Sequence, residues 1–431
     1  MNPAPIPPTA PFTPAGTAPV ARAPMKPLDE ALTELLARAL PLPGFEAVST
    51  FDADGRVLAQ DLVSSLDVPA LDNSSMDGYA VRCADWTSAA GVLQVNQRIP
   101  AGSSGRALEP FCAARIFTGA PIPPGADAVV MQELCETIDP EAGGAPGVRI
   151  QRQPQPGQWI RRRGEDVAAG TVVLHRGTRL GPAGLGLAAS IGFGMLQVAR
   201  RPRVALFSTG DELVMPGEVL PADLKPGTIY NSNRFFLKAL LLRLGCSVTD
   251  LGIVPDRLDA TVAALGGASQ SHDLILTSGG VSVGEEDHIK PAVQSLGELN
   301  LWQIAIKPGK PFAYGHIGAA HFMGLPGNPV SSFVTFLLLV RPFLLKLQGA
   351  TALAPESIAV HADFDWARAD KRREFLRVKQ NATGALELFR NQSSGVLTST
   401  VWGDGLVDNL PGQTIARGDM VRFIPFSALL S

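Results

Sequence analysis

The chain has 431 residues, more than one hydrophobic core usually serves, so we expect roughly two to four domains. With 45% apolar and 18% charged residues it has a globular composition, and its net charge of -3 argues against a nucleic-acid binder, which needs clustered Lys and Arg. The 4 cysteines are widely spaced and form no CxxC pair, so they indicate neither a zinc knuckle nor a disulfide framework and predict reduced thiols in a cytoplasmic protein.

The N-terminal segment 1–24 is rich in Pro, Ala and Thr and has no apolar stretch of a secretory signal, so it predicts a disordered leader. Apolar residues at helical spacing then predict an amphipathic helix over 28–38. The apolar run 333–345 falls short of the ~20 residues of a membrane span and contains Arg341 and Pro342, which favours a buried helix and no membrane partner.

From 46 to 194 the sequence has short β-like runs, such as 115–118, 128–131 and 170–174, separated by turns rich in Pro and Gly. This pattern predicts a mainly β N-terminal half. We divide it into a scaffold domain, made of 25–70 plus 167–202, and an inserted β-rich domain over 71–166.

Strand and helix alternate across 203–349, which predicts a three-layer, doubly wound domain with a parallel sheet. Its expected strands are 204–208, 247–254, 273–277 and 321–325, and its expected helices are 233–244, 259–265, 289–296 and 330–347. Short alternating segments such as 374–378 and 420–424 predict a small β-barrel over 350–431. The fold class is therefore a multidomain α+β protein.

Acidic residues follow three of the expected strands of the α/β domain: Glu212, Asp256 and Asp287. Ligands of parallel α/β sheets bind beyond the carboxyl ends of the strands, so we expect these three carboxylates at one rim. Hard carboxylate oxygens beside a phosphorylated ligand favour Mg²⁺ between them. Asp256 has an alternative role as the N-cap of the following helix, which its position alone leaves equally open.

Glycines and hydroxyls occupy the same rim. Gly279 and Gly280 permit positive φ and a close approach of backbone N–H groups to an anion, and the pattern fits neither a Walker loop nor GxGxxG. An ordinary turn is the alternative. The ligand-binding residues expected in these two loops are Ser208, Thr209, Gly210, Ser278, Gly279, Gly280 and Ser282.

The fourth expected strand leads into Pro326-Gly327-Asn328-Pro329, where Asn328 and Pro329 begin the next helix. The unsatisfied N–H groups and positive dipole end of that helix predict a second anion site at the rim. Lys307 and Lys310, which come shortly before that strand, are expected to neutralise remaining anionic charge.

Two dense polar stretches mark the N-terminal half, 72–80 and 161–166. The arginines of 161–163, followed by Gly and two acids, indicate either an anion clamp or a solvated face. Thr118 lies in a turn-rich segment where its hydroxyl is available to a ligand, although turn formation alone also explains the composition.

Taken together, these stretches resemble the molybdopterin molybdenumtransferases, bacterial relatives of the gephyrin E domain, over about 25–431. The most specific marks are DNSSMDGYAVR (72–82), FTGAPIPPGADAVVMQE (117–133), RRRGEDV (161–167), STGDEL (208–213), TSGGVSVGEEDHIK (277–290), IKPGKPFAYG (306–315) and LPGNPVS (325–331). Ser75 and Gln303 depart from residues common in that family, and Gln303 stands where some relatives have Lys.

The resemblance implies insertion of molybdate into adenylylated molybdopterin, with Mg²⁺-dependent release of AMP. It also implies a homodimer whose active cleft combines the α/β domain of one subunit with the N-terminal β region of the other. On this pattern Asp72, Thr118 and Asp166 face the α/β residues across the subunit boundary. Those α/β residues are Glu212, Asp256, Asp287, Pro326 and Pro329. Arg377 and Ser394 are implied as ligand contacts from the C-terminal domain.

Further partners implied are the adenylyltransferase of the preceding step and molybdoenzymes that accept the finished cofactor. Two other functions stay open at this point. One is adenylylation of molybdopterin, because that enzyme resembles the α/β domain alone, although it would not need 72–166. The other is a non-catalytic scaffold that binds cofactor or a partner peptide, a role suggested by the resemblance to the gephyrin E domain, which also anchors receptors. Within the transferase interpretation, a preference for tungstate over molybdate is also open.

Overall fold

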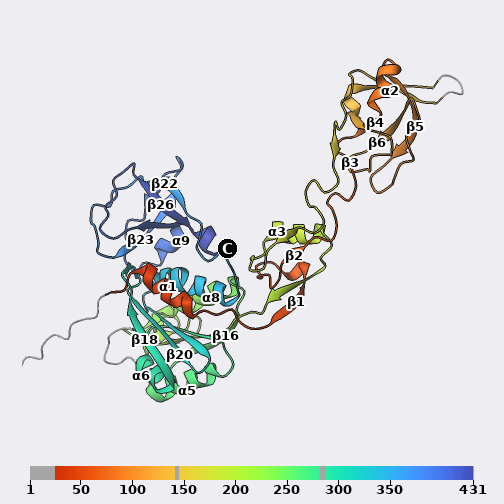
Figure 1. The fold of residues 1–431 in the computed structure, drawn as a ribbon. Coiled ribbons are helices and arrows are strands. Elements are labelled where there is room, and N and C mark those ends of the chain that lie inside the picture. The colour runs from red at the N-terminus through yellow and green to blue at the C-terminus, as the bar shows by residue number, and fades with distance from the viewer. Residues whose placement is uncertain (1–24, 141–144, 282–287, 431) are drawn as a thin grey trace, which may run out of the picture.

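The computed structural model describes residues 25–140, 145–281 and 288–430. The chain is elongated: the α/β and C-terminal domains lie together at one end, and a β-rich lobe lies at the other with a smaller scaffold between them (Figure 1). The leader expected over 1–24 lies outside the described residues. Within one chain, the lobe and the α/β domain therefore do not meet.

The α/β domain is built on a six-stranded sheet in the order β16-β13-β17-β21-β20-β18. Its strands are β16 (Ser247–Val254), β13 (Arg203–Thr209), β17 (Leu274–Ser278), β21 (Ala320–Leu325), β20 (Pro311–Ile317) and β18 (Gly297–Gln303). The first four are parallel, whereas β20 and β18 run antiparallel to their neighbours. The sheet is thus mixed and not wholly parallel as predicted, because the chain folds back as a hairpin on each side of β20.

Helices cover both faces of this sheet, since side chains of one strand alternate between them. Val204 and Leu206 of β13 pack into one core, whereas Ala205 and Phe207 pack into another. The second core contains α5 (Leu258–Ser269) and α6 (Ile289–Leu296). The helices of the first core are α1 (Leu28–Arg38), α4 (Ser232–Arg243), α7 (Pro329–Thr335), the π turn η4 (Phe336–Val340) and α8 (Arg341–Leu347).

The continuous helix Pro329–Leu347 is the one helix among the described residues that is long and apolar enough to cross a membrane. Most of its apolar stretch, 83% of the most hydrophobic window, is buried inside the protein. The buried helix expected from the apolar run is therefore what the structure shows.

The scaffold contains two short antiparallel pairs, β1 with β12 and β2 with β11. Its elements are β1 (Phe45–Ser49), η1 (Thr50–Asp52), β2 (Leu62–Val63), β11 (Val172–Leu174), α3 (Pro182–Ser190) and β12 (Met195–Ala199). Leu58, Leu180 and Val198 share its small core, so segments from before and after the lobe form one unit.

The lobe is a six-stranded sheet in the order β7-β4-β6-β5-β9-β8. Its elements are β4 (Gly78–Val81), α2 (Cys83–Ser88), β5 (Val92–Ile99), β6 (Cys112–Ile116), β7 (Ala128–Met131), η2 (Gln132–Leu134), β8 (Cys135–Ile138) and β9 (Gly147–Ile150). Gly78 is required there, because a Cβ at this position would lie 1.9 Å from the Val130 carbonyl oxygen. A two-stranded pair, β3 (Asn73–Ser74) with β10 (Ile160–Arg161), connects the lobe to the scaffold.

The C-terminal domain has a sheet in the order β19-β23-β25-β26-β22, with β24 paired to β23. Its elements are β19 (Ile306–Lys307), β22 (Ile358–His361), β23 (Arg373–Gln380), β24 (Leu386–Leu388), α9 (Thr398–Trp402), β25 (Gly405–Asn409), β26 (Met420–Pro425) and α10 (Phe426–Leu430). Over the described residues the ladder does not close on itself, so the expected barrel is not confirmed. The edge strand β19 comes from the α/β domain and ties the two domains together.

Candidate active site

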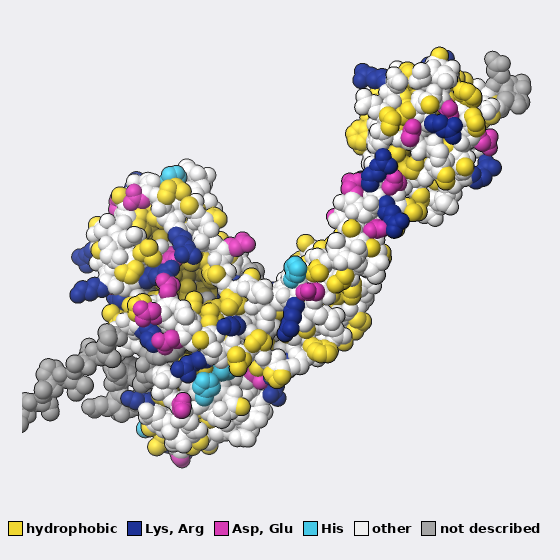
Figure 2. Space-filling view, viewed as in Figure 1, with side chains coloured by type: hydrophobic (Ala, Val, Ile, Leu, Met, Phe, Trp, Pro, Cys, Tyr) yellow, Lys and Arg dark blue, Asp and Glu magenta, His cyan; other side chains and the backbone are white. Residues whose placement is uncertain are grey.

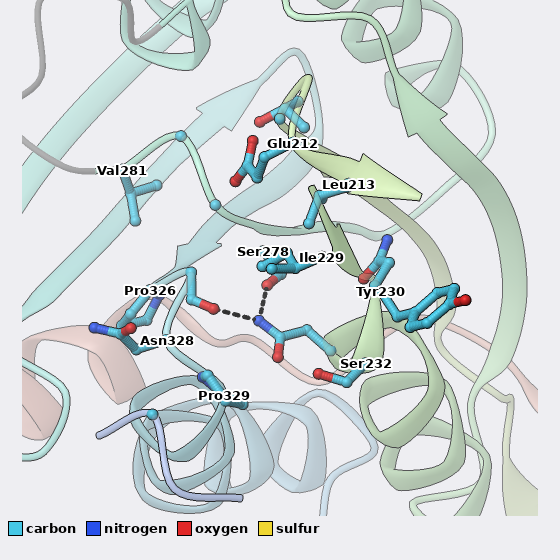
Figure 3. A pocket seen from close by; sticks show the side chains of 18 of the residues that line it. Glu212, Leu213, Ile229, Tyr230, Ser232, Ser278, Val281, Pro326, Asn328 and Pro329 are labelled. Atoms are coloured by element: carbon cyan, nitrogen blue, oxygen red, sulfur yellow. Dashed lines mark hydrogen bonds between the residues drawn. The ribbon is translucent and has the colours of Figure 1, made fainter. Parts of the chain in front are cut away.

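A cavity of about 680 Å³ opens where β13, β17 and β21 end (Figure 3). Loop residues after these strands, the start of α4 and the start of α7 form its wall. The lining residues are Thr209, Gly210, Glu212, Leu213, Ile229, Tyr230, Asn231, Ser232, Asn233, Asp256, Ser278, Gly279, Gly280, Val281, Pro311, Pro326, Gly327, Asn328, Pro329 and Gly395. The short strands β14 (Leu213–Val214) and β15 (Ile229–Tyr230) contribute lining residues on one side, and η3 (Pro221–Asp223) lies in the chain between them.

Two of the three acids expected at the rim line this cavity, Glu212 and Asp256. Asp256 does not cap α5: the N-cap position is Arg257, which makes no side-chain cap hydrogen bond. In Figure 3 Glu212 lies above Ser278, with Pro326, Asn328 and Pro329 below it in the view. The third acid, Asp287, and the expected hydroxyl Ser282 lie outside the described residues.

The glycine turn after β17 has the positive φ angles that the sequence predicts, +94° at Gly279 and +66° at Gly280. A Cβ at Gly280 would lie 2.5 Å from Ile289 Cγ1 and 3.0 Å from Thr209 Oγ1, so no larger residue fits without a shift. The N–H of Gly279 already donates to the Leu325 carbonyl at 3.1 Å, which couples this turn to the end of β21. Ser208 is 1% exposed inside β13 and does not line the cavity, because the wall begins at Thr209.

Asn233, which the sequence analysis did not assign to the site, joins two of the cavity loops. Its Nδ2 donates to Ser278 Oγ and to the Gly327 carbonyl, both at 2.7 Å, and its side chain is buried (Figure 3). This amide fixes the end of β17 against the loop before α7.

Asn231 also was not assigned to the site. Its Oδ1 accepts the Arg234 N–H at 3.3 Å and caps α4, whereas its buried Nδ2 has no partner among the described residues. A buried donor without a partner is uncommon, because its desolvation is not offset. In a wall that also carries two carboxylates, this amide is a donor available to a bound ligand.

The start of α7 is linked to the C-terminal domain. Pro329 is the first residue of the helix, Asn328 is its N-cap without a side-chain cap bond, and the Val330 N–H donates to the Ser394 carbonyl at 2.9 Å. Ser394 therefore reaches the rim through its backbone, and its neighbour Gly395 lines the cavity. One of the helix N–H groups expected to hold an anion is thus already occupied.

Lys307 has a different partner from the ligand expected. Its Nζ lies 2.9 Å from Glu374 Oε1 and 3.5 Å from Asp370 Oδ2, both in the C-terminal domain. Glu374 is 1% exposed and also accepts a 2.7 Å hydrogen bond from Trp366 Nε1. The charge of Lys307 is therefore balanced within the protein and holds two domains together, and Lys310 is not among the cavity-lining residues.

Arg377 likewise does not reach the cavity. It is 1% exposed and donates to the carbonyls of Phe375 and Ser393 and to Ser399 Oγ, at 3.0, 3.4 and 3.2 Å. Burial lowers the pKa of the Arg377 guanidinium to about 10. Arg377 therefore contacts the residue next to Ser394, through the Ser393 carbonyl, and supports that segment from the interior of the domain.

Three site residues were expected from the N-terminal half. Asp72, just before β3, and Asp166 lie in the neck, by which we mean 67–74 and 160–167 between the lobe and the scaffold, and Thr118 follows β6 of the lobe. In Figure 1 both β3 and β6 lie far from the α/β domain of the same chain. Asp72 accepts from Arg162 Nη1 at 2.7 Å and from the Arg163 N–H at 2.8 Å, and these contacts lower the pKa of Asp72, the backbone N–H most strongly. Thr118 donates through its N–H and its hydroxyl to Asp77, each at 2.7 Å. Asp166 is exposed.

Charged side chains gather at this neck between lobe and scaffold (Figure 2). Arg163 pairs with Asp67 at 2.5 Å, beside the pair of Arg162 with Asp72. Both arginine side chains are solvent-exposed, as the solvated-face alternative predicts, and they pair with the chain's own carboxylates. Among the described residues no group of three His, Cys, Asp or Glu is arranged to hold a metal ion.

The sequence matches three family models along nearly its whole length. Residues 26–192 match the MoeA N-terminal region (domain I and II), 205–346 match a probable molybdopterin binding domain, and 359–426 match the MoeA C-terminal region (domain IV).

Relatives agree with these matches. A molybdopterin molybdenumtransferase of Haemophilus influenzae is 40% identical over 94% of this chain and 99% of its own length, and one of Mycobacterium tuberculosis, molybdopterin molybdenumtransferase 2, is 42% identical over 69% and 74%. The crystal structure of a molybdopterin biosynthesis MoeA protein from Pyrococcus horikoshii OT3 superposes with a TM-score of 0.79, at 29% identity over 93% of this chain and 100% of that one.

Proposed function

Because the chain belongs to the molybdopterin molybdenumtransferase family, we propose that it inserts molybdate into adenylylated molybdopterin and releases AMP. It is a transferase of molybdenum cofactor biosynthesis. The observation that carries the finer reaction is the strand-end cavity, where a glycine turn, two carboxylates and a buried amide donor without a partner meet.

The cavity suits a nucleotide-bearing ligand. Its volume of about 680 Å³ lies in the range of small-molecule sites, roughly 300–1,000 Å³. Turns with backbone N–H groups in unusual conformations and helix starts are common phosphate sites, and Gly280, Asn328 and Pro329 provide both here. The Nδ2 of Asn231 supplies a neutral donor for a heterocycle or a phosphate oxygen.

The donor set also fits a divalent cation. Glu212 and Asp256 are the described carboxylates that would hold Mg²⁺, which when bound supplies positive charge next to the phosphoanhydride oxygens. Both carboxylates face the cavity without a described ion pair, so neither has to leave a partner to bind a cation. Asp287 is proposed as the third acid of this set.

The direct test uses the purified chain with adenylylated molybdopterin, Mg²⁺ and molybdate, and measures AMP release by chromatography. We expect release that depends on molybdate and is abolished by EDTA. Asp259→Asn, which changes an exposed acid of α5 outside the cavity, is the matched control for acid variants and keeps full activity. AMP release that is the same with and without molybdate would contradict the proposal.

We propose that the active cleft is completed by a second copy of the chain. The elongated shape separates Asp72, Thr118 and Asp166 from the strand-end cavity, so one subunit cannot bring both sets to one ligand (Figure 1). In a homodimer the lobe of one subunit would face the α/β domain of the other, and Ser394 with Arg377 would support the rim from the C-terminal domain.

Complementation tests this arrangement. Asp72→Asn and Asp256→Asn are each expected to inactivate the homodimer, whereas a mixed dimer has one cleft with both residues intact. Co-expression with two affinity tags should therefore restore about a quarter of wild-type activity in a random mixture, as two-fold symmetry requires. If mixed dimers are isolated with both tags and show no activity, the proposal of a shared cleft is contradicted.

We also propose a cytoplasmic enzyme that receives its substrate from an adenylyltransferase and delivers the cofactor to molybdoenzymes. All 4 cysteines are free, and Cys83, Cys112 and Cys246 are buried, as suits a reducing compartment. Cell fractionation checks the compartment, and recovery of the chain in the periplasmic fraction would contradict it.

A further inference from the structure

A second cavity, of about 780 Å³, lies where the scaffold, α8 and the C-terminal domain meet, and it shares no lining residue with the strand-end cavity. Gly181 and Pro182 line it from the scaffold, Arg341 from α8, and Ala428 from α10. Its volume, like that of the first cavity, is typical of small-molecule sites, roughly 300–1,000 Å³.

Arg341 supplies a buried cation to this cavity. It is 6% exposed, and its Nη1 and Nη2 donate to the carbonyls of Leu353 and Ala428, each at 3.1 Å. Its buried Nε has no hydrogen-bond partner, and no carboxylate pairs with Arg341 among the described residues. A buried guanidinium is costly unless it is paired, so its charge is left without compensation.

Arg179 adds a second cation to the same wall. Its Nε donates to the Gly55 carbonyl at 3.2 Å and its Nη2 to the Arg243 carbonyl at 2.9 Å, and it too forms no described ion pair. Burial, followed by the nearby Arg179 charge, lowers the pKa of Arg341. The two cations are therefore close enough to repel each other, and neutral carbonyls do not remove that repulsion.

The helix α3 begins at this cavity. Its N-cap Gly181 makes no side-chain cap hydrogen bond, and Pro182 is its first residue. The positive dipole end of this nine-residue helix is thus directed toward the wall that carries Arg179. Two exposed carboxylates, Asp54 and Glu356, also line the cavity and form no described ion pair with either arginine. The charge of Asp54 acts on Arg179 and partly offsets the lowering of the Arg179 pKa by burial, whereas no carboxylate acts on Arg341 in this way.

We propose that this three-domain cavity binds a phosphate-bearing small molecule, held by Arg341, Arg179 and the start of α3. A phosphate group offers oxygens to both guanidinium groups and to the helix start, the combination that commonly binds phosphates. Because the wall comes from three domains, a bound phosphate would also stabilise their arrangement. The site is separate from the cavity of the proposed reaction.

The test measures binding of inorganic phosphate to the full chain by calorimetry and by the thermal unfolding midpoint, at constant ionic strength against chloride. Arg179→Gln removes one guanidinium, and Arg176→Gln is the matched control, because Arg176 is an exposed arginine of the same scaffold outside the cavity. Any phosphate bound at the strand-end cavity is common to these proteins and cancels in the comparison.

We expect saturable stabilisation of the wild type and of Arg176→Gln, and about tenfold weaker binding at one site in Arg179→Gln, the loss of one charge-assisted contact. Circular dichroism shows whether the Arg341→Gln variant is folded. If it is folded, we expect it to bind no phosphate at that site; if it is unfolded, the proposal is tested by Arg179→Gln alone. An isotherm of Arg179→Gln identical to that of the wild type, or no phosphate-dependent stabilisation of the wild type, overturns the proposal.

Discussion

The rim of the α/β domain and the neck of the lobe both carry the acids of the proposed cleft, but they hold them differently. At the rim, Glu212 and Asp256 face a cavity and have no described ion pair. At the neck, Asp72 is held by Arg162 and by the Arg163 backbone, and Asp67 by Arg163.

This difference separates two jobs that acidic residues perform. Carboxylates without internal partners are available to a ligand or a cation. Paired carboxylates fix the local chain, and only their oxygen lone pairs without an internal partner are left for a ligand. We infer that the α/β rim binds the cation, whereas the ion pairs of the neck hold Asp72 in the position from which it would complete the proposed cleft. Variants at the rim and at the neck should therefore differ in their effects on activity and on stability.

The largest effect is expected from Asp256→Asn. The change removes a cavity-facing charge but no described ion pair, so AMP release should fall at least about a hundredfold, as for loss of an electrostatic group at a reacting centre. The free energy of unfolding should stay within about 0.5 kcal/mol of the wild type, as for surface substitutions. Steady-state kinetics and urea denaturation measure the two quantities; a large loss of stability would remove the contrast with the neck.

The second expected effect is that of Asn233→Ala. The substitution leaves Ser278 Oγ and the Gly327 carbonyl without their 2.7 Å donor in a buried site, which should cost about 2 kcal/mol of stability and loosen the cavity. Urea denaturation measures the loss of stability, and the rate of AMP release measures the effect on the cavity. Gln270→Ala, at the exposed end of α5, is the control and should change neither. An Asn233→Ala variant as stable and active as this control would show that the wall does not depend on the amide.

An acid response should also distinguish the two regions. The sequence 71–166 contains no histidine, whereas the α/β sheet contains two half-buried ones, His316 and His321. Tyr314 Oη is hydrogen-bonded to His316 and His321, each at 3.0 Å. Burial lowers the pKa of His321 to about 4 and lowers the pKa of His316 as well, and the nearby charges are Arg38, Glu298 and Asp273.

A lowered histidine pKa means that the unfolded chain binds more protons between about pH 4 and 6.5. The stability contributed by the neutral histidines is therefore complete above pH 6.5 and is lost as the pH falls toward 4. At the neck, hydrogen bonds to backbone N–H groups lower the pKa of Asp67 and Asp72, and that stability is lost only as the pH falls below 3.8.

Pulsed hydrogen exchange at decreasing pH, corrected for intrinsic rates, measures this order of opening. We expect β20 and β21 to lose protection before β4 and β6 of the lobe. His321→Gln should reduce the difference, and His361→Gln, an exposed histidine of the C-terminal domain, should not. Loss of protection in the lobe first would reverse the contrast.

The smallest effect is expected from Arg163→Gln at the neck. The side chain is 65% exposed, so loss of its pair with Asp67 should cost less than about 1 kcal/mol, and the cost should shrink at high salt. Arg161→Gln, an exposed neighbour without a described ion pair, is the control in the same denaturation series. A cost well above that range would mean that the neck is more than a set of surface pairs.

Much of the α/β domain was predictable because its signals are local. The helical spacing over 28–38 gives α1 with the same bounds, and the apolar segment 247–254 gives β16. Strand ends with Gly and acids predict the cavity, because the geometry of parallel strands places those ends together. The seven motifs predicted that the chain is a member of the transferase family, and the similarity to known proteins confirms it.

What the sequence did not predict depends on contacts between distant residues. The antiparallel strands β18 and β20 were missed, and the pairing of Lys307 with Glu374 spans 67 positions. Asn231 and Asn233 had a signal, two asparagines at the start of a helix. The partners of Asn233 come from two distant loops, and the Nδ2 of Asn231 is buried without a partner among the described residues, and neither fact can be read from local sequence. The domain limits and the ligand roles of the site residues stay predictions.

The lobe enters and leaves the scaffold at one place, where Val68 and Val167 exchange backbone hydrogen bonds of 2.7 and 3.1 Å. The two ends of the inserted lobe are therefore already in contact. If the lobe were removed, a very short linker could join these ends without displacing the scaffold. We therefore expect that lobes of different relatives can be exchanged at this junction, which would alter the lobe's part of the proposed cleft without changing the α/β rim.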